Sequence, residues 1–134
     1  MKKTCLALVL LVMMPGCGDP STPAAPTPVP ASITETFTGT LTVLGTNMHP
    51  FIVQRVGGMK VTLTSLTPSA TVVVGIGTVV SGATCAVVTS VLAQPATTPH
   101  VSGTATMPGS FCVSLADNGA LTESTVYTVT VIHS

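Results

Sequence analysis

With 134 residues, the chain is long enough for one domain and a targeting segment. Only 6% of the residues are charged, the formal net charge is zero and 3% are aromatic, so the sequence lacks the basic patch and the aromatic platform typical of nucleic-acid binding. Abundant Thr, Val and Gly, with few Lys, Glu or Leu at helical spacing, indicate an all-β fold.

Residues 1–16 have the pattern of a secretory signal peptide. Lys2 and Lys3 precede an apolar run over residues 5–14, which is short for a membrane-spanning helix. Gly16-Cys17 then resembles the cleavage box of a bacterial lipoprotein, in which Cys17 becomes the lipidated first residue. The alternative is ordinary signal cleavage and secretion, with Cys17 an incidental thiol. Because no clean Ala-x-Ala site lies nearby, we expect lipidation at Cys17.

Residues 17–32 are predicted to form a lipid-anchored, disordered tether. The sequence GDPSTPAAPTPVPAS, over residues 18–32, is rich in Pro, Ser, Thr and Ala and has too little apolar surface for a core. Repeated proline favours an extended, semi-rigid chain. An O-glycosylated stalk is the alternative.

The folded domain is predicted over residues 33–134, with side chains alternating at the period of two that strands require. The clearest case is the alternation of Met59, Val61 and Leu63 with polar neighbours. Strands are expected at 34–43, from 50, at 59–64, 71–76, 78–80, 85–92, 101–107, 111–116 and 127–132. Turns are expected at 45–47, 57–58, 67–69, 108–109 and 117–119, where Gly, Pro, Asn and Asp gather. The strands at 111–116 and 127–132 need not be direct partners, because their connection is longer than a tight hairpin.

The uncharged segment 70–93 has the length of a transmembrane helix, but its composition favours two or three buried strands. Three glycines interrupt it, most of its apolar residues are β-branched Val, and no Lys or Arg flanks it closely. About eight strands in roughly 100 residues then predict an antiparallel β-sandwich, with a small barrel as the lesser interpretation.

Three segments together resemble a known family: TFTGTLTVLGTNMHPFIV at 36–53, GGMKVTLTSL at 57–66 and SFCVSLADNGALTESTVYTVTV at 110–131. Their order is similar to that of the bacterial pre-peptidase C-terminal domain. The resemblance implies a jelly-roll-like β-sandwich that serves as a non-catalytic accessory domain on secreted proteins, often beside a peptidase. Members often carry acidic residues after the strand that corresponds to 59–66. Here residues 70–76 contain no carboxylate, so calcium binding and substrate adhesion are not carried over.

No group of residues has the spacing of a metal or cofactor site. The three histidines, His49, His100 and His133, are too far apart in sequence for a zinc motif and are expected at solvated loop or strand-end positions. Weak calcium candidates are Asp117, Asn118 and Glu123, whose spacing is not that of an EF-hand loop. A turn held by Asx hydrogen bonds explains Asp117 and Asn118 without a metal. No cofactor is expected.

The cysteines predict one disulfide. Cys5 leaves with the signal peptide and Cys17 is assigned to the lipid, so Cys85 and Cys112 remain as a pair in an exported chain. A cysteine nucleophile is the alternative. No G-x-S-x-G elbow, phosphate loop or paired carboxylates appear in the sequence.

The function expected from these observations is that of a non-catalytic, exported lipoprotein of the bacterial cell envelope. It would contact the membrane through its lipid anchor and act as an accessory interaction module that binds an envelope protein or a glycan, not nucleic acid. The alternatives are a structural envelope component without a soluble ligand and, less favoured, a secreted hydrolase.

Overall fold

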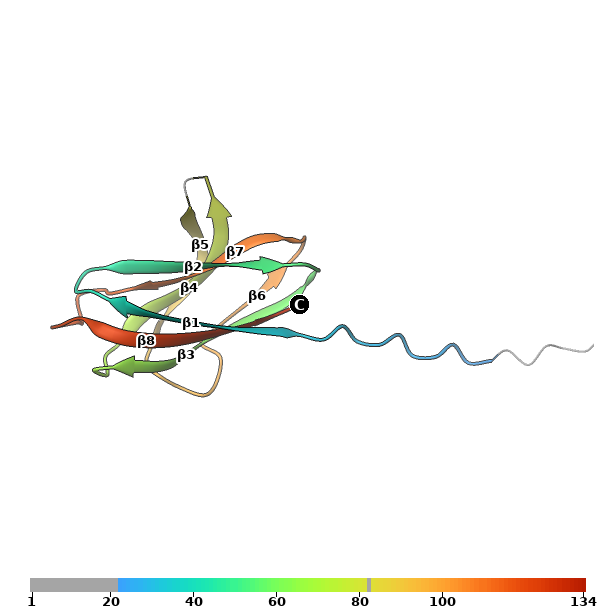
Figure 1. Cartoon of the computed structure of the whole chain (residues 1–134), viewed down its shortest axis with the longest axis horizontal. Helices are drawn as coiled ribbons and strands as arrows, with labels where there is room; N and C mark the ends of the chain where they lie inside the picture. Colours follow the sequence, from blue (N-terminus) through green and yellow to red (C-terminus); the bar gives the residue numbers. More distant parts are fainter. Residues whose placement is uncertain (1–21, 82) are drawn as a thin grey trace, which may run out of the picture.

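The described part of the chain folds into eight β-strands that form two packed antiparallel sheets (Figure 1). A computed structural model describes residues 22–81 and 83–134. The strands are β1 (Ile33–Leu41), β2 (Thr46–Val53), β3 (Gly57–Thr67), β4 (Val72–Val80), β5 (Thr84–Ala93), β6 (Val101–Ala105), β7 (Gly109–Ala116) and β8 (Thr125–His133). The all-β prediction, with an eight-stranded sandwich, is therefore confirmed.

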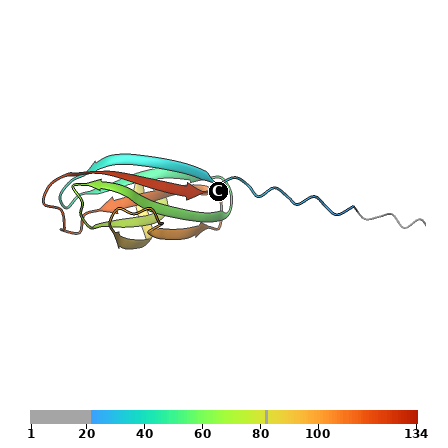
Figure 2. The same ribbon diagram turned by 90° about the horizontal axis from the view of Figure 1, so that it is seen from below.

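The strand order is that of a jelly roll. One sheet has the order β1-β8-β3-β6 and the other β2-β7-β4-β5, and both are antiparallel. Figure 2 shows the two sheets as stacked layers. Strands β7 and β8, which are consecutive in the sequence, lie in different sheets, as the long connection between them allows.

The core lies between the sheets and follows from the period-two pattern. In β8, Tyr127, Val129 and Val131 point inward and are fully buried, whereas Thr128 and Thr130 alternate with them on the other face. The opposite sheet contributes Phe51, Val53, Val72, Val74, Ile76, Val113 and Leu115 to the same cluster. Burial of these apolar side chains is the main force that holds the two sheets together.

The turn between β1 and β2 does not lie where the sequence predicts it. The turn expected at 45–47 lies earlier, because β1 ends at Leu41 and Gly45 donates a backbone hydrogen bond to Thr42 (2.8 Å), while β2 already begins at Thr46. Leu44 has a positive φ of 57° in this turn. Its N–H donates to the carboxylate of Asp117, 73 residues away (2.8 Å), a contact that local sequence patterns do not reveal.

The segment 57–58, expected as a chain break, begins β3 instead. Gly58 pairs with Thr104 of β6, so the two glycines extend the ladder rather than end it. The uncharged segment 70–93 forms β4 and β5, and the two short strands predicted at 71–76 and 78–80 are one strand. The helical alternative for 70–93 is therefore excluded.

The predicted signal peptide (1–16) and the predicted lipid acceptor Cys17 lie outside the described residues. Residues 22–32, the described part of the predicted tether, are exposed, belong to no strand and lead away from the sandwich (Figure 1). Within residues 22–81 and 83–134, no helix has the length and apolarity that a membrane crossing needs.

Candidate functional site

A polar cluster links the two sheets around Tyr127. The side chain of Tyr127 is fully buried. Its hydroxyl accepts a hydrogen bond from Asn47 Nδ2 (3.1 Å) and has its own proton to donate to His49 Nε2, which lies 2.7 Å away. Phe37 stacks on the His49 ring at a centroid distance of 4.9 Å. Burial lowers the pKa of His49. Burial also raises the pKa of Tyr127, and the hydrogen bond from Asn47 partly offsets this rise. The expectation of a solvated His49 is therefore wrong.

His133 also has a structural role. Its buried ring places Nε2 2.8 Å from Oε1 of Glu35 and packs on Phe51 at a centroid distance of 5.2 Å. The residue does end β8, as expected of a strand-end position, but it is buried and not solvated. The pair with Glu35 therefore joins the end of β8 to β1.

His100 completes the hydrogen bonding of β3 from the loop that joins β5 and β6. Its Nδ1 accepts from the Leu63 N–H (3.2 Å), so its Nε2 carries the proton and donates to the Gln94 carbonyl (2.7 Å). Backbone bonds from Ala96 to Leu63 and from His100 to Val61 add to this contact. The loop therefore covers the part of β3 beyond its pairing with β6. No group of three or more His, Cys, Asp or Glu among the described residues is placed to hold a metal ion.

Asp117, the first of the weak calcium candidates, is held by backbone hydrogen bonds. Asp117 Oδ1 accepts from the N–H groups of Gly119 (3.0 Å), Ala120 (2.9 Å) and Leu121 (3.1 Å), while Oδ2 accepts from Leu44. This arrangement is the Asx-type turn that the sequence favoured. Both carboxylate oxygens are thus used to hold the two loops at this end of the sandwich.

The other two calcium candidates, Asn118 and Glu123, are exposed. Glu123 lines a hollow of about 70 Å³, and Thr125 is another of its lining residues. The hydroxyl of Thr125 is the one buried side-chain N or O atom without a hydrogen-bond partner in the described part of the chain.

Asp117 is expected to make the protein acid-sensitive. The N–H of Leu44 lowers the pKa of this carboxyl most; burial opposes the shift, and the N–H groups of Leu121, Ala120 and Gly119 reinforce it. Because the folded-state pKa is lower than the unfolded value of about 3.9, the carboxylate stabilises the fold above that pH, and this stability is lost as the pH falls through the folded-state pKa. In urea unfolding, the stability gap between the wild type and Asp117→Asn should shrink as the pH falls below about 4. A gap that is constant with pH would contradict this; Glu123→Gln, on the exposed part of the same loop, is the control.

The disulfide predicted between Cys85 and Cys112 is present. Cys85 lies in β5 and Cys112 in β7, and both strands pair with β4, which separates them. In a flat sheet such strands would be about 9–10 Å apart, twice the usual strand spacing. Their Cα atoms are only 5.8 Å apart, so β5 bends over β4 at this point.

Gly77 is the residue that permits this bend. A Cβ atom there would clash with the backbone carbonyl of Ala86 in β5. The register between β4 and β5 also shifts here, because Ile76 pairs with Thr89 while Gly77 pairs with Val87, which leaves Val88 as a bulge. In Figure 1 the turn end of the β4–β5 hairpin stands out from the body of the sandwich.

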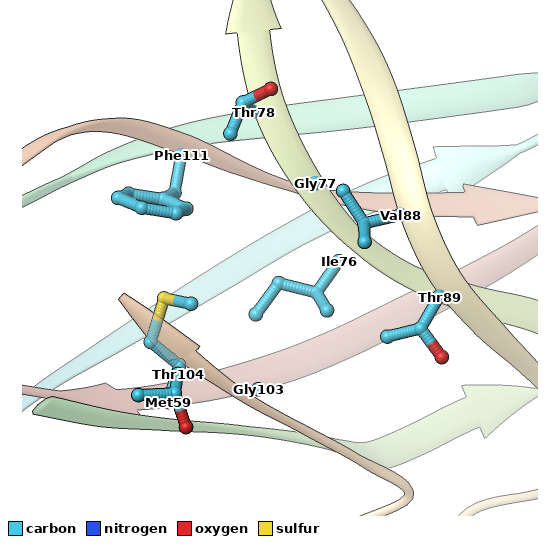
Figure 3. A pocket seen from close by; sticks show the side chains of 9 residues that line it. All are labelled: Met59, Ile76, Gly77, Thr78, Val88, Thr89, Gly103, Thr104 and Phe111. Carbon is cyan, nitrogen blue, oxygen red and sulfur yellow. The ribbon is translucent and has the colours of Figure 1, made fainter. Parts of the chain in front are cut away.

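The bend opens the core to solvent between β5 and β6. A notch of about 100 Å³ lies there, with the apolar side chains of Met59, Ile76 and Phe111 around it (Figure 3). Its full lining is Met59, Ile76, Gly77, Thr78, Val88, Thr89, Gly103, Thr104 and Phe111. We call this notch, together with β5 and β6, the open flank.

Strand β5 presents apolar side chains to solvent on both of its faces. Val88 is 79% exposed and Leu92 61%, and Val87 and Val91 are also exposed. Nine of its ten residues are not buried, and none of the ten is charged. An apolar surface of this kind beside a core opening is typical of an interaction site.

A larger hollow, of about 260 Å³, lies under the turn end of the same hairpin. It is lined by Thr46, Asn47, Met48, Ala83, Thr84, Cys85 and Ser114. This lining mixes polar and apolar side chains and includes no charged side chain or aromatic ring to orient a ligand. The open flank, which combines an apolar notch with an exposed strand edge, is the better candidate for binding.

This surface could not be predicted from the sequence. The apolar content of residues 85–92 predicts a strand, but a buried one, whereas nine of the ten residues of β5 are not buried. The consecutive valines Val87-Val88 break the alternation at the bulge. They do not mark an edge, because the central strand β4 also contains consecutive valines.

Comparisons with known proteins establish only the fold. No protein-family model matches the chain, and no curated protein matches it. Among solved structures, the chain is similar to the Yersinia pseudotuberculosis-derived mitogen, with a TM-score of 0.52 and 16% sequence identity over 78% of this chain and 88% of that one. At this identity the likeness supports the sandwich architecture and does not assign an activity. The resemblance to the pre-peptidase C-terminal domain stays a prediction.

Proposed function

We propose that the protein is an exported, lipid-anchored interaction module of the bacterial cell envelope that binds a protein partner through its open flank and has no catalytic role. The observation that carries the proposal is the opening of the core between β5 and β6, where Met59, Ile76 and Phe111 line a notch. Exposed apolar side chains on β5 adjoin this notch. A partner that covers the flank would remove all of this apolar surface from water.

The dimensions of the notch fit a peptide side chain. A cavity of about 150 Å³ holds a benzene-sized molecule, so about 100 Å³ accommodates one aliphatic side chain. Beside it, β5 ends the strand order of its sheet, so one of its main-chain edges has no paired strand among residues 22–81 and 83–134. A strand of the partner could pair with this edge through main-chain hydrogen bonds, which would provide affinity. One of its side chains could enter the adjoining notch, which would provide specificity.

A protein partner fits this flank better than a glycan does. The chain has three Phe, one Tyr and no Trp. Tyr127, Phe51 and Phe37 pack in or against the core, and Phe111 lines the notch, so none of them forms the exposed aromatic platform that sugar rings stack on. The titratable groups His49, His133 and Asp117 are engaged in structural hydrogen bonds, which favours binding over hydrolysis.

The anchor can be tested separately from the binding surface. The full chain, expressed in a bacterium, should partition into detergent, because several acyl chains on one terminus hold a protein firmly at a membrane. Cys17→Ser should remain in the aqueous phase. Equal partitioning of the two proteins would exclude the lipid anchor while leaving the flank untouched.

The flank can be tested by site-specific photo-crosslinking in cells. A benzophenone side chain at Leu92 of the full chain is expected to give a discrete adduct with a protein. The matched control is Val126, which is exposed to a similar extent (57% against 61%) but lies on β8 in the other sheet. Adducts from Val126 and not from Leu92, or none from either position, would overturn the proposal.

A further inference from the structure

The sandwich has four edge strands, and three of them carry features that block strand addition. In β1, Glu35 places a carboxylate on the edge strand, and β2 has Pro50 near its middle, which has no N–H to donate. Strand β6 has only five residues. Natural sandwiches use charges, proline and short strands in this way to prevent edge-to-edge association.

Strand β5 lacks these three protections. It is ten residues long, from Thr84 to Ala93, and contains no charged residue and no proline. It does have a bulge at Val88, which hinders strand addition at that point and divides the strand into two parts. The second part, Thr89–Ala93, pairs with Val72–Ile76 in the body of the sheet, and its other edge is the end of that sheet.

We infer that β5 pairs antiparallel with β5 of a second copy of this chain, which joins the two β2-β7-β4-β5 sheets into one continuous sheet. This inference rests on the proposed function, since it names the protein partner of the same flank. Two-fold symmetry requires a self-complementary surface, so that every contact is made twice. The second part of β5 meets this requirement, because Thr, Ser, Val, Leu and Ala can face one another in any antiparallel register without opposing like charges.

The absence of charge on β5 also indicates which partner it fits. Because β5 has no charged group, it offers nothing to a partner that binds through charge. The surface that complements it is therefore another uncharged strand edge rich in β-branched side chains. This chain supplies such an edge in β5. Lipid anchoring would further favour pairing by confining the copies to one surface, which raises their effective concentration.

The inference is tested by native mass spectrometry of the full chain in mild detergent, with Leu92→Lys and Val88→Lys as disrupting variants. Both side chains are mostly exposed, so the fold should tolerate lysine, and formation of the Cys85–Cys112 disulfide in each variant reports that folding is intact. The control is Ile52→Lys, at a 63% exposed position on β2, the opposite edge of the same sheet. Because each substitution enters a two-fold interface twice, the dimer dissociation constant should rise at least about tenfold for the β5 variants and stay unchanged for the control.

A monomeric wild type overturns the inference, as does a dimer that Ile52→Lys weakens and Leu92→Lys does not. Crosslinking from Leu92 tests the proposed function and the pairing with a second copy separately. An adduct of twice the mass of the chain supports both the flank and the second copy. An adduct with a different protein keeps the proposed function and overturns the inference. No adduct at Leu92 overturns both.

Discussion

Removal of the Cys85–Cys112 disulfide is expected to lower the free energy of unfolding by about 3–4 kcal/mol. The crosslink spans 27 residues, and closure of a loop of this length restricts the unfolded chain by that amount on the chain-entropy model. Small domains have a total stability of about 5–15 kcal/mol, so the loss is a large share of it. The measurement is urea unfolding of Cys85→Ala/Cys112→Ala against the oxidised wild type.

The reduced wild type is the control for this experiment. It keeps both sulfur atoms, so it separates the effect of the crosslink from the small change in packing that alanine makes at the fully buried Cys112. The double variant and the reduced protein should unfold at similar urea concentrations, both below the oxidised protein. Equal stability of the oxidised and reduced proteins would contradict the prediction.

Much of the fold could be predicted from the sequence because it depends on a local, repeated signal. Alternation at a period of two marks most of the strands, as in Tyr127, Val129 and Val131. The disulfide followed from the number of cysteines in a chain that was predicted to be exported. The turn before β2 could not be placed in this way. The N–H of Leu44 is held by Asp117 from 73 residues away, so its geometry is a product of the tertiary fold.

The histidines and the candidate site were harder to predict for the same reason. Whether His49 and His133 are solvated depends on partners in other strands, Tyr127 and Glu35, that the sequence places far away. The open flank depends on which strand ends a sheet and on how sharply that strand bends. An apolar, β-branched segment such as β5 has the composition of a buried central strand, and only the strand order shows that it lies at an edge.

Gly77 determines the shape of the open flank, and Gly77→Ala is expected to destabilise the fold by at least about 3 kcal/mol, at the upper end of the range for overpacking. The added Cβ would meet the carbonyl of Ala86, a backbone group that cannot rotate away as a side chain can. Strand β5 would have to move away from β4, and this movement would strain the disulfide that Cys85 of β5 forms with Cys112. It would also change the wall of the notch, because Gly77 is one of the residues that line it. The free energy of unfolding in urea measures the effect.

Gly58→Ala is the matched control, because it adds the same methyl group to a strand glycine with no heavy atom within 4 Å of the new Cβ. Alanine also restricts the unfolded chain more than glycine does, so this variant should be stabilised by about 0.4–1 kcal/mol. The difference between the two variants therefore isolates the contact of β5 with Gly77. If they prove equally stable, β5 does not pass over Gly77 as described, and both the bend and the notch that depends on it are wrong. If Gly77→Ala alone is destabilised and also loses the Leu92 crosslink, the bend of β5 over β4 is what shapes the binding surface.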